Sequence, residues 1–311
     1  MIDIFLLMVQ LSDLSGIKKD PLIVLNSENG QNDILYKPTD LALSDDGHIF
    51  ILDPGEGHIF KFDLNGNIVG TFSRKGYGPG EICLTTKILT LVENKIWLGD
   101  KDSGKIQIFD EKGQFELGFR PKKINRVGSM VVIGNEVFVV DLSLSHSPIE
   151  VYSLDHRYLR SIGGNLSINK DYKRTAGLWN FLRMSRGHGD KLVMGFIYDN
   201  RIMIWDNNGP QNNYDMQLFY PKHEDVKEGR ILPGGYSAVS FSRGPRGSFL
   251  IAACDLETRT CGKIIQVTGN MKGLLGQREL GLTIKRIRYN PNLDLLAMIN
   301  ANHEIILYDT Y

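Results

Sequence analysis

The sequence has no excess charge of either sign and no apolar run long enough to cross a membrane. Its 311 residues include 36 lysines and arginines against 36 aspartates and glutamates, so the overall charge does not favour nucleic acid or another polyanion as a partner. The apolar segment 4–9 is too short to span a bilayer, and we expect no transmembrane segment. Patterns of long amphipathic helices and low-complexity tracts are missing too. What remains, 42% hydrophobic residues with 33 glycines, is typical of an all-β chain with many tight turns.

Motifs that mark common catalytic and metal sites are also missing. Gly-x-Ser-x-Gly, His-Glu-x-x-His and Cys-x-x-Cys do not occur. The seven histidines are scattered, and no two have a spacing that would let them share a metal locally. The glycine-rich segment 76–80 superficially suggests a phosphate-binding loop, but no strand-loop-helix pattern surrounds it. We therefore predict neither a metal nor a cofactor, although distant segments could still assemble a histidine site.

There are only three cysteines. Cys83 stands alone, whereas Cys254 and Cys261 flank an expected hairpin connection that could bring their Cα atoms within disulfide range. A disulfide, which would indicate an oxidising compartment, and a pair of free thiols both fit the sequence.

The N-terminus makes a poor signal peptide. Asp3, rather than lysine or arginine, precedes the apolar segment, and neither a small-residue cleavage site nor a lipid-accepting cysteine follows it. An extra β-strand, an imperfectly chosen start and a targeting segment all remain open.

Two stretches of the sequence align without a gap at a spacing of 47 residues. Asp53 and Asp63 end two consecutive apolar strands in the first stretch, and Asp100 and Asp110 end the matching strands in the second. A self-similar unit of ~40–50 residues built from short apolar strands is typical of a β-propeller blade. The repeat therefore indicates a propeller.

Looser copies of this pattern follow, which makes six units in all. The central strands of each unit are nearly continuous apolar runs, as expected for sheets buried on both faces. We predict one domain spanning 1–311, an all-β, six-bladed β-propeller of four-stranded antiparallel blades. The predicted blades cover residues 38–72, 88–117, 129–162, 178–219, 236–274 and 284–309.

The sixth unit has only three strands before the sequence ends. An open ring would leave strand edges unpaired, which proteins avoid. The apolar segment 22–25 belongs to no blade of its own. We predict that this N-terminal strand pairs with the last blade and closes the ring.

Aspartate or asparagine recurs at the ends of the second and third strands of the units. A single carboxylate in a loop would suggest catalysis or metal binding, but recurrence in several blades favours a structural role. Aspartate and asparagine side chains accept hydrogen bonds from nearby backbone amides and so stabilise turns. The recurring residues are Asp53, Asp100, Asp141, Asp255 and Asn300 after the second strand, and Asp63, Asp110, Asp206 and Asp309 after the third.

The longest connections join the fourth strand of one blade to the first strand of the next, so they share one face. They cover residues 26–37, 73–87, 118–127, 163–177, 220–235 and 275–286. Together they contain 17 basic and 8 acidic residues, which predicts a basic face able to attract anionic ligands. Solvated loop charges without a ligand would give the same pattern.

Residues near the starts of the innermost strands should point toward the axial opening on this face. Trp179 could stack on a sugar there or pack in the core. The candidate ligand-binding residues are Asp40, Lys87, Arg126, Trp179, Tyr236, Lys285 and Arg286.

The first unit, residues 38–53 with its following hairpin, resembles an NHL-type repeat. The segment Arg74-Lys75-Gly76-Tyr77-Gly78-Pro79-Gly80-Glu81 is similar to the Gly-x-Gly-Pro-Gly-Glu loop of six-bladed propellers abundant in Bacteroidetes. The resemblance implies a six-bladed fold and an exported or lipid-anchored, extracytoplasmic protein whose activity is largely unassigned. The loop itself suits a structural role, with Glu81 accepting hydrogen bonds from a turn whose glycines permit positive φ.

We favour a monomeric ligand-binding or interaction propeller of unassigned activity over an enzyme, with an anionic small molecule or acidic glycan as the ligand of the basic face. The first alternative is a metal-dependent lyase or a lactonase-like hydrolase, because enzymes with NHL-like propellers use metal ligands that converge on the axis. The second alternative is a protein-interaction scaffold that uses the same face for larger apolar contacts.

Overall fold

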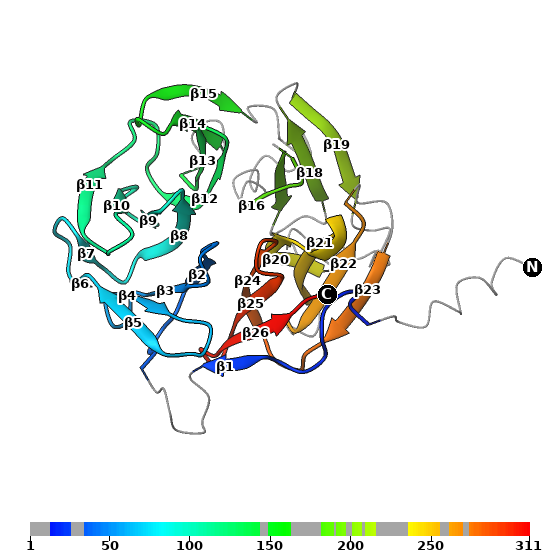
Figure 1. The fold of residues 1–311 in the computed structure, drawn as a ribbon. Helices are drawn as coiled ribbons and strands as arrows, with labels where there is room; N and C mark the ends of the chain where they lie inside the picture. Colours follow the sequence, from blue (N-terminus) through cyan, green and yellow to red (C-terminus); the bar gives the residue numbers. More distant parts are fainter. Residues whose placement is uncertain are drawn as a thin grey trace, which may run out of the picture.

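Six four-stranded antiparallel sheets surround one axis in the computed structural model of the chain (Figure 1). The predicted fold class is confirmed. The structure describes residues 13–25, 34–143, 149–162, 182–189, 191–196, 201–206, 209–215, 236–255, 261–269 and 274–311. Among these residues no helix is long and apolar enough to span a membrane.

Each blade runs from an innermost strand at the axis to an outermost strand at the rim. The first blade contains β2 (Asp40–Leu43), β3 (Ile49–Asp53), β4 (His58–Phe62) and β5 (Ile68–Phe72). The second contains β8 (Thr86–Val92), β9 (Lys95–Asp100), β10 (Ile106–Phe109) and β11 (Phe115–Phe119). The third contains β12 (Val127–Ile133), β13 (Glu136–Asp141), β14 (Ile149–Ser153) and β15 (Tyr158–Ile162).

The remaining blades follow the same order. The fourth contains β16 (Leu182–Arg186), β17 (Leu192–Phe196), β18 (Arg201–Asp206) and β19 (Gly209–Asp215). The fifth contains β20 (Tyr236–Arg243), β21 (Phe249–Asp255), β22 (Lys263–Val267) and β23 (Leu274–Glu279), with a 3-10 turn at Pro245–Gly247. The sixth contains β24 (Ile284–Asn290), β25 (Leu295–Asn300), β26 (Ile305–Asp309) and the N-terminal β1 (Ile23–Leu25).

Some blades extend past the sequence-predicted limits. β23 continues to Glu279, which pairs with Lys263, so the fifth blade does not end at 274. β8 and β12 begin at Thr86 and Val127, two residues before the predicted starts. The first long connection also contains a short parallel pair, β6 (Arg74–Lys75) with β7 (Glu81–Ile82). In β8, β12 and β23, the backbone stays extended beyond the apolar run, so the hydrogen bonds to the neighbouring strand continue there.

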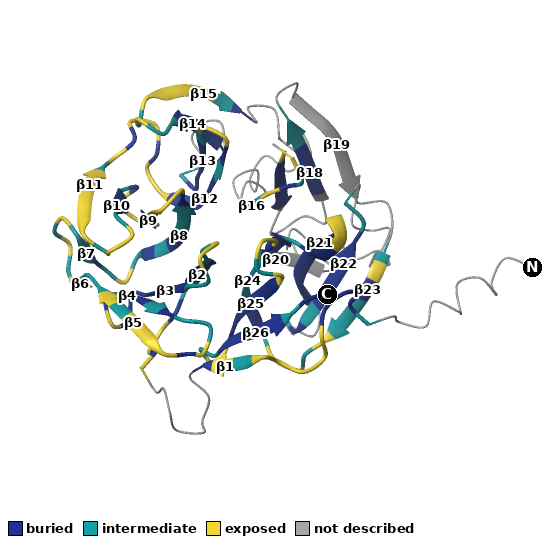
Figure 2. Cartoon of the chain, viewed as in Figure 1, coloured by how far each residue is buried: buried dark blue, intermediate teal, exposed yellow. Residues whose placement is uncertain are grey.

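In the blades whose rim strands are coloured in Figure 2, burial decreases from the middle strands to the rim. All residues of β3 are buried, whereas β5 at the rim contains only exposed and half-buried residues. Neighbouring blades cover both faces of the middle strands, which explains why their sequences are continuously apolar instead of alternating. The core is therefore a ring of apolar layers between blades.

The predicted closing strand is confirmed. β1 pairs antiparallel with β26, and Leu25 lies opposite Ile305. Just before it, Asp13 forms an ion pair of 2.6 Å with Arg278 of the fifth blade. This bond lowers the pKa of Asp13. The N-terminal segment thus holds the last two blades together.

Recurrent aspartates stabilise turns, as predicted. The Asp53 carboxylate accepts hydrogen bonds from the amides of Tyr36, Lys37, Gly55 and Glu56. Asp100, its counterpart 47 residues later, accepts the amides of Asp102 and Ser103. Asp63 and Asp110 likewise accept amides two and four residues ahead. The side chain of Asp255 lies outside the described residues.

Glu81 stabilises its own loop. Its carboxylate accepts a hydrogen bond of 2.9 Å from the Gly78 amide and one of 2.8 Å from Arg74 Nε. These bonds lower the pKa of Glu81. A Cβ atom on Gly76 would come within 2.0 Å of the Glu81 carboxylate, so any larger residue would displace this carboxylate from its hydrogen bonds. The Gly-x-Gly-Pro-Gly-Glu segment is thus a structural loop.

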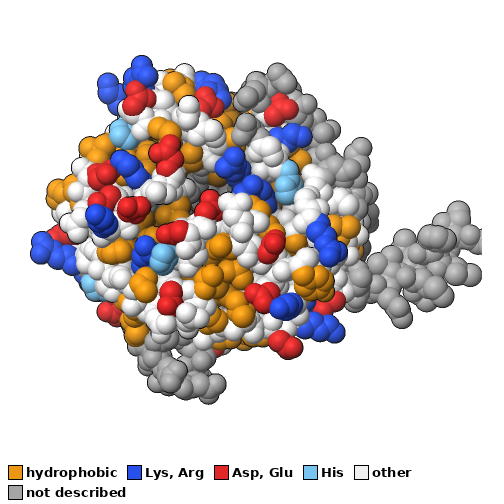
Figure 3. Space-filling model, in the orientation of Figure 1, with side chains coloured by type: hydrophobic (Ala, Val, Ile, Leu, Met, Phe, Trp, Pro, Cys, Tyr) orange, Lys and Arg blue, Asp and Glu red, His pale blue; other side chains and the backbone are white. Residues whose placement is uncertain are grey.

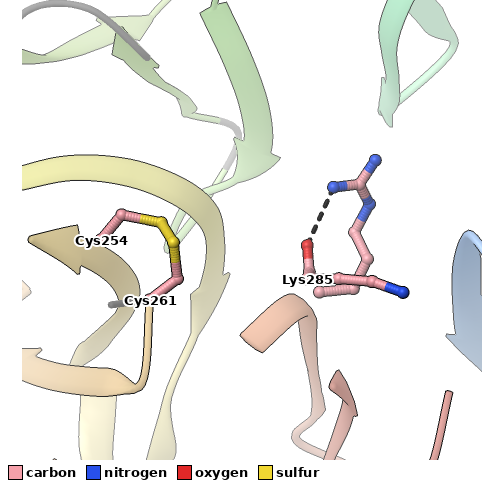
Figure 4. Close-up of a disulfide and its surroundings, with 4 residues drawn as sticks. Cys254, Cys261 and Lys285 are labelled. Atoms are coloured by element: carbon pink, nitrogen blue, oxygen red, sulfur yellow. Dashed lines mark hydrogen bonds between the residues drawn. A yellow bond between two sulfur atoms is a disulfide. The ribbon is translucent and has the colours of Figure 1, made fainter. Parts of the chain in front are cut away.

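Cys254 and Cys261 form a disulfide across the β21–β22 connection, which decides between the two alternatives that the sequence left open (Figure 4). Cys83 is a free thiol that donates a hydrogen bond to Asp100.

Replacing Leu25 with alanine tests the closing strand. Leu25 is 2% exposed and belongs to the core cluster shared by the first and last blades. We expect Leu25→Ala to lower the free energy of unfolding by about 2–4 kcal/mol, because the cavity it leaves lies in a packed interior. Urea denaturation measures this loss.

The neighbouring Leu22 provides the matched control, since it is 48% exposed. Leu22→Ala should change the free energy of unfolding by less than about 0.5 kcal/mol. Equal losses for the two variants would contradict a buried role for β1.

Candidate functional site

A cavity of about 640 Å³ lies on the propeller axis. All six innermost strands line it near their C-terminal ends, for instance at Leu43 of β2, Leu91 of β8 and Val132 of β12. It opens beside the turns that join the first and second strands of the blades. Connections between blades lie at the opposite end of the axis, so this cavity is not on the long-loop face.

The wall of the cavity is divided by charge. Arg186, Arg243 and Arg288 line it from the fourth, fifth and sixth blades. The opposite side, from the first two blades, is mainly acidic: Asp45, Asp46, Glu93 and Glu111 line it, together with one cation, Lys61. Figure 3 shows the hollow at the centre of this face, with lysine or arginine side chains over β16 and β20 and acidic ones over β2 and β8.

Arg243 is half-buried, as are Arg288 and Lys61 of the same lining. Burial and repulsion from Arg186 lower the pKa of Arg243. Among the described residues it forms no ion pair and no side-chain hydrogen bond. A desolvated guanidinium without a close counterion attracts an anionic ligand.

Below the cavity, the channel is held together by Asp40. This residue is 1% exposed, and its carboxylate accepts hydrogen bonds from the Leu89 amide at 3.1 Å and from Arg288 Nη2 at 2.9 Å. Arg286 Nε lies 3.4 Å away. Asp40 thereby connects the sixth, first and second blades. Asp40 was predicted as a ligand-binding residue, and in the structure its carboxylate bonds to protein groups that hold the channel together.

The structure brings two of the predicted candidates, Lys87 and Lys285, close to each other and to Lys37 near the long-loop end of the axis. Burial and repulsion from Lys37 and Lys101 lower the pKa of Lys87. Burial and repulsion from Lys37, Lys87 and Arg286 likewise lower the pKa of Lys285. Figure 4 shows Lys285, whose backbone carbonyl accepts a hydrogen bond from Arg286. We call Lys37, Lys87 and Lys285 the lysine cluster.

The other candidates do not join this cluster. Arg126 forms an exposed ion pair of 3.2 Å with Asp102, so its charge is balanced locally. Trp179 lies outside the described residues. Tyr236 begins β20 and pairs with Asp255 through the backbone, and its side chain is outside the described part of the chain.

Sequence reasoning missed the arginines of the cavity because it placed the site at the starts of the innermost strands. A signal for them exists. Ser-Arg ends both β16 and β20, at Arg186 and Arg243, and each arginine pairs with the first residue of the next strand. This repeat occurs in two of the six units, and it shows that the two arginines occupy equivalent positions without showing that a cavity lies there.

No group of three or more histidine, cysteine, aspartate or glutamate side chains that could hold a metal occurs among the described residues. The prediction that no metal is bound stays a prediction, because ligands could come from the rest of the chain.

Comparisons with solved structures identify the same architecture. Virginiamycin B lyase from Staphylococcus aureus matches with a TM-score of 0.54 and 13% identity, over 92% of this chain and 87% of that one. The β-propeller domain of Cps50 (Swd1) from Myceliophteria thermophila matches with a TM-score of 0.56 and 10% identity, over 94% and 99%. What they share is the propeller fold. No family model and no curated protein matches the chain.

Replacing Lys87 with methionine tests the repulsion in the lysine cluster. The lowered pKa means that folding disfavours the charged amine, so Lys87→Met should stabilise the protein at neutral pH. Solvent screening limits this gain to less than about 1 kcal/mol. The gain should shrink as the pH rises from the folded pKa toward 10.5, where the unfolded lysine also loses its proton.

Denaturation of both proteins across this pH range measures the effect. Lys112→Met is the control, because Lys112 is exposed in a turn of the second blade. A Lys87 variant that is less stable than the wild type at neutral pH would contradict the predicted repulsion.

Proposed function

We propose that this protein is a binding propeller that holds an acidic saccharide, or a similar hydroxylated organic anion, in the axial cavity. The observation that carries the proposal is the half-buried Arg243 without a close counterion on a cavity wall shared with Arg186 and Arg288. Ligand cavities typically measure about 300–1,000 Å³, and this cavity of about 640 Å³ falls within that range.

The basic side of the wall suits a carboxylate. Guanidinium groups donate paired hydrogen bonds that match the geometry of a carboxylate, and such charge-assisted bonds are strong in a partly desolvated site. Arg288 already donates to Asp40, which fixes its side chain in place. Arg243 has no comparable bond within the described residues, so it is the main candidate to bind the anionic group.

The acidic side suits hydroxyl groups. Carboxylates only accept hydrogen bonds when ionised, and sugar hydroxyls donate them. Asp46 is held ionised, since hydrogen bonds from Ser44 and His48 lower its pKa. Tyr289 adds an aromatic surface to the lining, and Leu43, Leu89 and Leu91 add apolar contacts. A ligand with one anionic group and several hydroxyls matches both sides of this wall.

The site predicted from the sequence remains a second proposed anion-binding surface. The lysine cluster supports it, because the charges of Lys37, Lys87 and Lys285 repel one another at that end of the channel. Much of the surrounding long-loop face lies outside the described residues, and the cavity at the other end is the better-supported site.

We also propose that the chain belongs to the exported propellers with NHL-type repeats. The Glu81 loop forms the turn expected of an exported NHL-type propeller, and the disulfide suits an oxidising compartment. The first alternative is a metal-dependent lyase or hydrolase, and one structural neighbour is a lyase. Such a reaction in this protein would need metal ligands from outside the described residues. A scaffold role would need a larger apolar contact surface than the charged cavity wall provides.

Calorimetric titration with galacturonate oligosaccharides tests the proposal. We expect saturable binding to the wild type that weakens about tenfold or more in Arg243→Gln, because a charge-assisted hydrogen bond contributes about 1.5–3 kcal/mol. Neutral galactose oligosaccharides should bind more weakly than the acidic ones.

Arg157→Gln is the matched control. Arg157 lies in an exposed turn of the third blade, where it forms an ion pair with Asp155. It carries the same charge but does not line the cavity. Binding that is absent in the wild type, or equally weakened in both variants, would rule out the proposed site.

A further inference from the structure

A second, much smaller cavity lies inside the channel, below the axial cavity. Its volume is about 10 Å³. The innermost strands of all six blades line it, and Met130, Met184 and Arg288 border both cavities. Three of its lining residues are arginines, Arg183 from the fourth blade and Arg286 and Arg288 from the sixth, and Asp40 is its only described carboxylate.

The single carboxylate does not balance this charge. Asp40 accepts hydrogen bonds from the Leu41 and Leu89 amides and from Arg288. Asp40 Oδ1 also lies 3.4 Å from Arg286 Nε, in an ion pair. The bond to Arg288 balances one positive charge. Arg286 shares the same carboxylate, and Arg183 forms no ion pair with a carboxylate among the described residues, so one negative charge faces three positive charges in this desolvated space.

Arg183 is the least satisfied member of the group. Its Nη1 donates a hydrogen bond of 2.6 Å to the Gly128 carbonyl, but its Nε is buried and has no hydrogen-bond partner. Burial, followed by repulsion from Arg286, lowers the pKa of Arg183 to about 9. At neutral pH the guanidinium is thus still charged. A buried charge and a buried N–H donor without a partner are both costly.

An anion would resolve both costs at once. It would accept the hydrogen bond from Arg183 Nε and offset one of the two positive charges that Asp40 leaves unbalanced. The cavity is at the lower limit for a single water, which needs about 10–15 Å³, so a monatomic anion slightly larger than water enters when the flexible side chains of Met130 and Met184 at its border move outward. A phosphate or an organic carboxylate is too large.

We propose that the channel binds one halide-sized inorganic anion, such as chloride, between Arg183 and Arg286. The bound anion joins the fourth and sixth blades across the axis, where their innermost strands are not paired with each other. Its role is structural. Arg288 borders both cavities, but Arg183 does not line the upper cavity and Arg243 does not line the lower one, so variants of these two residues test the two sites separately.

Thermal unfolding in different salts tests this site. The wild type is compared in sodium chloride and in sodium gluconate, whose anion is too large for the cavity, at equal ionic strength. We expect chloride to raise Tm above the gluconate value by about 2 °C or more and to saturate. Arg183→Met should lose this increment, whereas the surface variant Arg157→Met should keep it.

Because both variants are measured in the same salts, general salt effects on stability cancel. No chloride increment in the wild type, or an increment retained in Arg183→Met, would overturn the proposal. No saccharide is present, so failure here leaves the upper cavity unaffected, and failure of saccharide binding leaves this site unaffected.

Bromide provides a direct measurement that needs no variant. Crystals of the wild type grown in sodium bromide should show an anomalous scattering peak within hydrogen-bond distance of Arg183 Nε. A water in that position, or bromide peaks only on the outer surface, would contradict the inference even if Arg183→Met failed to fold.

Discussion

The innermost strands of neighbouring blades splay apart and cannot hydrogen-bond to one another as a sheet, and the rest of the structure depends on how this constraint is met. Side chains replace the missing ladder. Asp40 accepts the amide of Leu89 in the next blade, and Ser129 accepts that of Met184. Ser240 does the same for Ile287. Each bond joins the innermost strand of one blade to that of the next.

This arrangement makes the axis polar inside an otherwise apolar ring. A buried backbone amide requires an acceptor, so oxygen-bearing side chains must face the channel. Once a carboxylate such as Asp40 is there, arginines can enter the channel as its partners, as Arg288 does. More arginines converge than one carboxylate can balance, and the lysine cluster adds to them at one end. The positive charge that Asp40 does not balance attracts anionic ligands to the axis.

Local features could be predicted from the sequence because their hydrogen bonds join residues that are only a few positions apart in the chain. Asp63 accepts amides two and four residues ahead, so its role follows from the turn alone. The closing strand was predictable because one blade lacked a strand and one segment lacked a blade. The cavity was not predictable in this way. Arg186, Arg243 and Arg288 lie in separate blades, and no local pattern shows which end of a strand meets the hollow of the axis.

By itself, the sequence determined the blade, the number of blades and the turns, because a repeated apolar pattern with turn residues at fixed offsets allows few other structures. It also determined that the chain has basic residues near the axis. Only the tertiary structure decided which of them act together. Ring closure places Arg286 and Arg288 beside Asp40, some 250 residues earlier in the chain, and beside Arg183 of the fourth blade. Charges so far apart in sequence acquire a common environment only through the geometry of the closed ring, since desolvation and repulsion depend on distance in space.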